Sequence, residues 1–176
     1  MFAMKHTLVA LLRDQPGVLN RSVSLFRRRG FNIESLTVGH TETPGISRMT
    51  LVVDGDTTSV EQVIKQLYKL IDVLKVSDVS QDPNVTRDLL LVKVYAPPAK
   101  RSELMQLADI FGAKIVDVVP DAMMIELSGS PEQLDRFVDL IRPFGIRELV
   151  RTGCVAMTRG ASTVSGPYQN QEFRAA

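Results

Sequence analysis

The sequence has no tryptophan, a single cysteine and two histidines among its 176 residues. Since Cys154 is alone, a disulfide framework and a metal site built from several cysteines are excluded. No apolar run approaches the roughly 20 residues that a membrane-spanning helix needs. The first residues, MFAMKHTLVALLRD, are apolar but contain no small-residue cleavage site, so they do not predict a signal peptide. We therefore expect a cytoplasmic protein that does not act at a membrane.

An excess of charge of either sign is also lacking. Lys and Arg number 21 against 20 for Asp and Glu, which gives a formal net charge of +1. This balance provides no general attraction to nucleic acid or to an anionic membrane. Aromatic residues make up only 6 % of the chain, too few to predict a platform for stacked bases. Apolar residues reach 44 %, so the chain can build a packed core as one domain or two small ones.

Groups typical of catalysis are equally scarce. Only His6 and His40 could serve as an imidazole base, and neither lies in a recognisable constellation with a nucleophile. We expect both histidines to be at the surface or half-buried, and Cys154 to be a small buried hydrophobic residue. No glycine-rich phosphate loop, HExxH or CxxC pattern occurs. We predict no catalytic residue and no metal site in this chain.

The sequence does contain one order of elements twice. Apolar runs that suit strands alternate with segments whose apolar residues recur at helical spacing, and Gly30 and Gly112 predict helix ends. Ser130 is predicted to cap the last helix, with Gln133 reaching back to it. One helix is predicted after the first strand and one after the third strand of each copy. The predicted strands are 7–14, 31–41, 46–54 and 73–80 in the first copy and 89–96, 113–119, 123–129 and 146–153 in the second.

Each copy therefore follows the order βαββαβ. Short connections and the handedness of crossovers favour the ferredoxin-like arrangement, a four-stranded antiparallel sheet with two helices on one face. We predict an α+β fold with two ferredoxin-like βαββαβ units, residues 4–80 and 88–160, joined by a polar linker at 81–87. The other sheet faces and the edge strands are expected to stay available for a partner. The tail, residues 161–176, has no periodicity and is predicted to be disordered.

The stretch RDQPGVLNR lies at the first strand-to-helix junction. Pro16 is tolerated in a first helical turn, Gly17 allows close approach to its backbone, and the first N–H groups of a helix are unpaired and partly positive. We expect this turn and the start of the second strand to lie at the same sheet end. If two copies pair through that strand, Asn32 of one chain then faces residues 14–18 of the other. Such a pocket suits a free amino acid, with Asp14 near its ammonium group. Helix capping by Asp14 and a turn at Asn32 explain the same residues equally well.

The first unit resembles an ACT domain, a small βαββαβ module that senses amino acids. The segments DQPGVLNR, LFRRRGFNIESLTVG, SRMTLVV and QLYKLIDVLKVSD resemble, in that order, the regulatory small subunit of acetohydroxyacid synthase (acetolactate synthase). In the second unit, RDLLLVKVYA, SPEQLDRFVDLIRPFGI and VRTGCVAMTRG resemble the same family. The resemblance covers roughly residues 4–160.

This resemblance implies a regulatory chain that performs no chemistry itself. Small subunits of the family bind a catalytic large subunit that uses thiamine diphosphate, Mg²⁺ and FAD to make acetolactate from pyruvate. They raise its activity and confer feedback inhibition by a branched-chain amino acid, usually valine in bacteria. The resemblance therefore implies no cofactor in this chain, and a homodimer with the effector at the interface between two ACT domains.

The resemblance also implies the residues of the effector site. The N–H groups of Gly17 and Val18 would meet the effector's carboxylate, and Asn32, with Ile33 beside it, would come from the other chain. Asp14 stands where the family often has asparagine, so the acceptor for the ammonium is kept and an amide donor is lost. In the second unit APPAKRS replaces the D-x-P-G pattern and AKI replaces FNI. No amino-acid site is expected there, and we predict a core-forming and partner-contacting domain.

Other functions stay open at this point. The chain could be a stand-alone ACT-type amino-acid sensor acting on another partner. The βαββαβ order is also that of an RNA-recognition module, but TLVALL and ISRMTLVV lack the aromatic residues with which its first and third strands read bases. An enzyme in its own right would have to show turnover by this chain alone. Candidates for the surface that contacts a catalytic chain are Arg27–Arg29 and Arg48.

Overall fold

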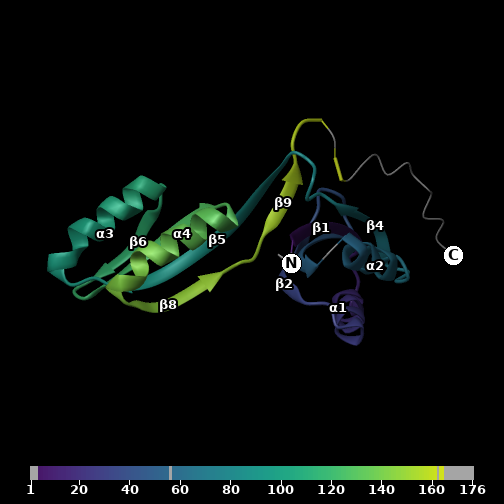
Figure 1. Cartoon of the computed structure of the whole chain (residues 1–176), viewed down its shortest axis with the longest axis horizontal. Helices are drawn as coiled ribbons and strands as arrows, with labels where there is room; N and C mark the ends of the chain where they lie inside the picture. The colour runs from purple at the N-terminus through teal and green to yellow at the C-terminus, as the bar shows by residue number, and fades with distance from the viewer. Residues whose placement is uncertain (1–3, 56, 162, 165–176) are drawn as a thin grey trace. The chain divides into compact units, whose positions relative to one another are not determined.

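The structure, a computed structural model, describes residues 4–55, 57–161, 163 and 164. The chain forms two compact units (Figure 1). The first comprises residues up to Val85 together with those from Ala156 onward, and the second comprises Thr86–Val155. Each unit has an antiparallel sheet with two helices in the order βαββαβ, which confirms the predicted α+β class. None of the helices in the described part of the chain is long and apolar enough to span a membrane.

The sheet of the first unit has the strand order β2-β3-β1-β4, with antiparallel neighbours throughout. Leu8, Ala10 and Leu12 alternate along β1 and join a core cluster with Phe26 of α1 and Leu67 of α2. This burial holds both helices on one face of the sheet. The elements are β1 (Met4–Arg13), α1 (Val18–Arg29), β2 (Ile33–His40), β3 (Ile46–Gly55), α2 (Thr57–Leu67) and β4 (Val73–Asp78).

The other face of this sheet is covered by the returning end of the chain. Val9 of β1 is fully buried and clusters with Val79, Ala156 and Val164. A guanidinium N–H of Arg48 donates to the carbonyl of Ala156. The expectation of an open sheet face is therefore wrong for the first unit. Both faces of β1 are buried, which explains why its sequence is apolar at successive positions.

This return also changes the predicted boundaries. The residues from Ala156 onward belong to the first unit, whereas the sequence predicts a second domain of residues 88–160. Val164 was assigned to a disordered tail but is only 6 % exposed. The predicted disorder of residues 162 and 165–176 concerns positions outside the described residues and stays a prediction. Within the predicted linker, β5 already begins at Asn84.

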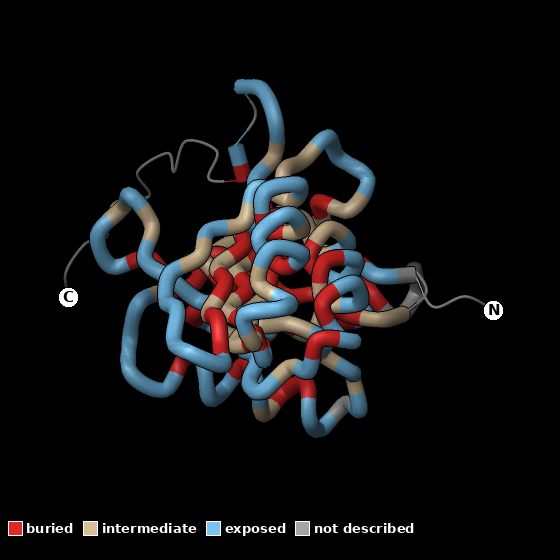
Figure 2. The backbone as a smooth tube through the Cα atoms, turned by 90° about the vertical axis from the view of Figure 1, so that its left-hand side faces the viewer, coloured by how far each residue is buried: buried red, intermediate tan, exposed pale blue. Residues whose placement is uncertain are grey.

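The second unit repeats the architecture, with the sheet order β6-β7-β5-β8. Leu90, Val92 and Val94 of β5 pack with Leu104 and Phe137 of its two helices. The strand β9 (Val155–Thr158) also pairs with β5. In Figure 2 the backbone tube is red at buried residues and pale blue at exposed ones, which include most of the outer loops. The other elements are β5 (Asn84–Tyr95), α3 (Pro98–Phe111), β6 (Lys114–Val119), β7 (Ala122–Gly129), α4 (Pro131–Ile141), the 3-10 helix η1 (Arg142–Phe144) and β8 (Ile146–Arg151).

The helix ends show which local predictions hold. Gly30 and Gly112 end α1 and α3 with left-handed backbone, as predicted. The Ser130 side chain accepts from the Gln133 N–H at 3.3 Å, which confirms the predicted cap of α4. The Gln133 side chain does not reach back, because its amide donates instead to the carbonyl of Phe111 at 3.3 Å.

Candidate functional site

The turn after β1 presents unpaired backbone donors at the start of α1. Gly17 occupies the N-cap position with φ +84° and ψ −8°, a left-handed conformation that side chains disfavour. The N–H groups of Gly17, Leu19 and Asn20 have no hydrogen-bond partner among the described residues. The Val18 N–H, which the resemblance assigned to a carboxylate, lies 3.3 Å from the Gln15 carbonyl. Three donors with positive partial charge therefore remain for an anion.

The turn before α1 is exposed, whereas the first residue of the helix is buried. Asp14, Gln15, Pro16 and Gly17 are exposed, so the loop is accessible. The Val18 side chain is only 4 % exposed and lies in the core, which fixes where the helix starts. The helix therefore begins at a residue anchored in the core, while the residues just before it are exposed.

Asp14 is held by the turn between β2 and β3. Its N–H donates to the Gly45 carbonyl at 2.8 Å, and its carboxylate lies 3.2 Å from Nδ1 of His40. No helix N–H donates to the Asp14 side chain among the described residues, so the capping alternative has no support. The His40 side chain is 84 % exposed, so this pair contributes little stability. The Asp14 carboxylate thus lies beside the end of β2 and keeps acceptor capacity.

Asn32 and Ile33 lie at the opposite end of the same sheet. Arg13, at the end of β1, pairs with Ile46, whereas Ile33 pairs with Val53 near the other end of β3. The expectation that the turn and the start of the second strand share a sheet end is therefore wrong. The reason is the crossover: α1 runs back along the sheet, so β2 starts where β1 started. Since β2 has eight residues, its ends are about 23 Å apart.

An ion pair between Arg21 and Asp72 stabilises this turn. Nε and Nη2 of Arg21 donate to the same carboxylate oxygen of Asp72, at 3.1 and 2.5 Å. Asp72 is 5 % exposed, and its carbonyl accepts from the Arg13 N–H at 2.9 Å. Asp72 therefore connects the last residue of β1 to the first turn of α1. Sequence reasoning missed this pair; a basic residue four positions after Gly17 was the only signal for it.

The other singled-out residues have structural roles. His6 is only 4 % exposed and lies 3.1 Å from the Asp78 carboxylate, so its expected surface or half-buried position is wrong. Cys154 is 4 % exposed, as predicted. Burial raises the pKa of its thiol, and the charge of Asp88 adds to that rise. No group of His, Cys, Asp and Glu side chains suited to a metal ion occurs among the described residues.

The basic candidates for partner contact differ from one another. Arg48 is used inside the first unit, where it binds the Ala156 carbonyl, and burial lowers the pKa of its guanidinium. Arg27 and Arg28 are exposed on α1, with Arg28 Nε donating to the Ser24 carbonyl at 3.3 Å. The side chain of Arg29 lies outside the described residues. Arg27 and Arg28 are therefore the more accessible candidates, whereas Arg48 is half-buried and already binds within the first unit.

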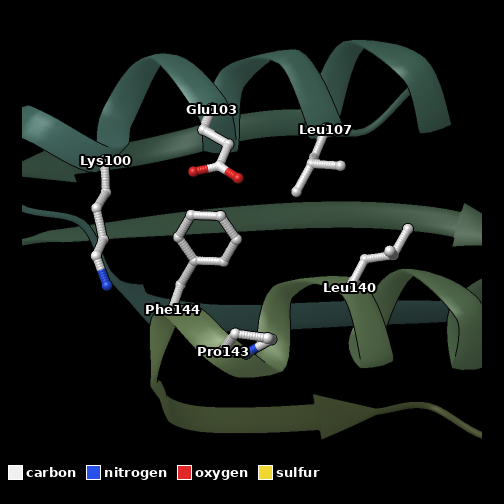
Figure 3. Close-up of a pocket in the computed structure, with 6 residues that line it drawn as sticks. All are labelled: Lys100, Glu103, Leu107, Leu140, Pro143 and Phe144. Carbon is white, nitrogen blue, oxygen red and sulfur yellow. The ribbon is translucent and has the colours of Figure 1, made fainter.

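The corresponding turn of the second unit is built differently. Arg101, in the first turn of α3, donates to the carbonyls of Ala96, Val119 and Pro120. Pro97 and Pro98 begin this helix and have no N–H to offer. A groove of about 290 Å³ lies elsewhere, between α3 and α4 (Figure 3). Its lining residues are Lys100, Glu103, Leu107, Leu140, Pro143 and Phe144.

The comparisons with known proteins agree with this architecture. A family model described as the AHAS small subunit-like ACT domain matches residues 8–75, so the first unit is an ACT domain. A second model, the small subunit of acetolactate synthase, matches residues 87–160.

Relatives that match about 90 % of this chain define its family further. A probable acetolactate synthase small subunit from Archaeoglobus fulgidus is 56 % identical over 157 residues, covering 89 % of this chain and 98 % of that one. The acetolactate synthase small subunit of Aquifex aeolicus is 47 % identical, covering 90 % and 83 %. The crystal structure of the small subunit from Thermotoga maritima superposes with a TM-score of 0.83 at 39 % identity, covering 90 % and 99 %. The chain belongs to the family of acetolactate synthase small subunits.

Proposed function

We propose that this chain binds the catalytic large subunit of acetolactate synthase, raises its activity and confers feedback inhibition by valine or another branched-chain amino acid. The single observation that carries the proposal is the turn at Gly17, with unpaired N–H groups at the start of α1, in the ACT domain of a small subunit. Thiamine diphosphate, Mg²⁺ and FAD would belong to the large subunit, and this chain would perform no chemistry. A cytoplasmic location stays a prediction from the sequence.

The effector site would lie between two chains. β2 is an edge strand, so a second copy can add its own β2 across a two-fold axis. Antiparallel pairing of β2 with its copy brings the start of one strand to the end of the other. Because His40 at the end of β2 lies beside Asp14, the partner's Asn32 would then lie near the turn at Gly17. The opposite positions of Asn32 and Gly17 in one chain thus favour a two-chain site.

Exposed apolar side chains support such pairing. Leu19 and Val23, one turn apart on α1, are 43 % and 39 % exposed, and Val38 on β2 is 41 % exposed. Burying them against a second copy would contribute favourably, since apolar area removed from water is worth about 25 cal/mol per Å². We propose that α1 and β2 together form the dimer surface.

The regulation follows from linkage. A ligand that contacts both chains favours the dimer arrangement that completes its site, and it shifts the equilibrium only by its differential affinity. A feedback signal near millimolar concentration needs a binding free energy of roughly −4 to −6 kcal/mol. Charge-assisted hydrogen bonds to the carboxylate, together with burial of an isopropyl group, are of that order.

The direct test is co-purification with the large subunit, followed by acetolactate assays with and without valine, leucine and isoleucine. We expect a stable complex, higher activity than the large subunit alone, and inhibition by at least one of the three. Failure to associate would refute the proposal. Binding of a branched-chain amino acid without that association would favour the stand-alone sensor instead.

The effector site has its own test. Gly17→Asp would place a carboxylate beside the unpaired N–H groups, where it repels the ligand's carboxylate. Isothermal titration with valine should lose its signal for this variant while circular dichroism stays unchanged. Asn32→Ala should weaken binding less. Normal valine binding by Gly17→Asp would show that the site is elsewhere.

A further inference from the structure

The Arg21 guanidinium binds Asp72 through Nε and Nη2, and its Nη1 lies next to Gly17. A guanidinium carries five N–H donors, and Arg21 uses Nε and Nη2 on Asp72. Its Nη1 has no hydrogen bond to any described residue. A Cβ added to Gly17 would lie 3.2 Å from this Nη1. Nη1 is therefore adjacent to the backbone whose N–H groups are unpaired.

Asp72 fixes the direction of that guanidinium. Its side chain is 7 % exposed, whereas the Arg21 side chain is 48 % exposed, so the ion pair is buried on one side only. The Asp72 main chain is itself bound to the Arg13 N–H, and the Arg21 N–H donates to the Gly17 carbonyl at 3.0 Å. The guanidinium is thus held by Asp72, while the main chains of Asp72 and Arg21 are bound to the two ends of the turn.

We propose that Arg21 binds the carboxylate of the amino-acid effector through Nη1, together with the backbone N–H of Gly17. This inference rests on the proposed effector site and adds to it a charged residue that supplies carboxylate selectivity. It gives Gly17 a second role, because any side chain there would fill the space between the guanidinium and the turn. In the second unit the arginine near the corresponding turn, Arg101, donates Nε and Nη2 to three backbone carbonyls instead of to a buried carboxylate.

The test compares valine with valinamide, which keeps the ammonium and isopropyl groups but lacks the negative charge. Isothermal titration of the full chain would measure both ligands for the unmodified protein, for Arg21→Met and for the control Arg28→Met. Arg28 is an exposed arginine on the same helix, and its one hydrogen bond among the described residues is to the Ser24 carbonyl. Leucine and leucinamide replace the pair if leucine is the ligand that binds.

If Arg21 donates a charged hydrogen bond to the carboxylate, Arg21→Met should lower the affinity for valine by about 10- to 100-fold. The affinity for valinamide should change by less than about 3-fold, so the ratio of valine affinity to valinamide affinity falls sharply. Arg28→Met should leave both affinities unchanged. A purely structural role would weaken both ligands equally and keep their ratio.

The affinities can be compared only between variants that fold. Arg21→Met leaves the buried Asp72 carboxylate without its partner, so the double variant Arg21→Met/Asp72→Asn removes both charges and serves as the second test. Thermal unfolding checks each variant. Retention of the valine-to-valinamide ratio in both variants would overturn the inference while leaving the proposed function intact. No binding of any branched-chain amino acid by the unmodified chain would refute the proposed site itself.

Discussion

Gly17→Ala tests the turn with the smallest possible change. At φ +84° a residue other than glycine loses roughly 1–2 kcal/mol, and the lower entropy of the unfolded chain offsets about 0.4–1 kcal/mol of that. The new Cβ would lie 3.2 Å from Arg21 Nη1, a tight contact that the flexible guanidinium can relieve by moving. We expect a net loss of about 1 kcal/mol, or a fall in Tm of about 2–4 °C for a chain of this length.

Effector affinity should fall in Gly17→Ala and not in a variant that strains a glycine elsewhere. The methyl group and the displaced guanidinium occupy the place proposed for the carboxylate, so valine should bind at least about 10-fold more weakly by isothermal titration. Gly30→Ala is the matched control, because Gly30 has φ +68° and a Cβ there would meet nothing within 4 Å. It should cost similar stability in urea unfolding and leave valine binding unchanged. Equal affinity losses in both variants, or none in Gly17→Ala, would refute the reasoning.

Other predictions concern the second unit and the returning segment. Asp88→Ala should lower the free energy of unfolding in urea by about 2–4 kcal/mol, because its buried carboxylate accepts three hydrogen bonds. The control Asp139→Ala, in an exposed ion pair, should lower it by less than about 0.5 kcal/mol. Ala156→Asp should cost about 3 kcal/mol, and the exposed Met157→Asp nearly nothing; equal costs would contradict the packing of this segment. Cys154 should react with iodoacetamide only slowly at pH 8 until the chain is unfolded, since a raised thiol pKa leaves little thiolate.

Local patterns predicted much of the fold. The apolar run of residues 7–14 predicted a strand, and β1 lies there, between β3 and β4. Gly30 and Gly112 end their helices, and Ser130 caps α4, because turn and cap chemistry depends on neighbouring residues. Family resemblance added the ACT domain, because the βαββαβ order alone also fits an RNA-recognition module.

Long-range contacts escaped the sequence for a physical reason. The packing of Ala156 and Val164 on Val9 joins residues that no periodic pattern relates. The Arg21–Asp72 pair likewise spans 51 positions. Gly17 could be recognised from a Pro-Gly pair before a helix, but the sheet end at which Asn32 lies depends on the crossover.

The central claim is that one effector site takes residues from two chains, and mixing two defective variants tests it most directly. In a two-fold dimer of Gly17→Asp with Asn32→Ala, one site carries both defects and the other carries neither. Equal, randomly exchanged amounts should recover about a quarter of the normal valine sites in titration, although each variant alone binds poorly. No recovery in a mixture shown to exchange subunits would mean that the site lies within one chain, and the account would be wrong.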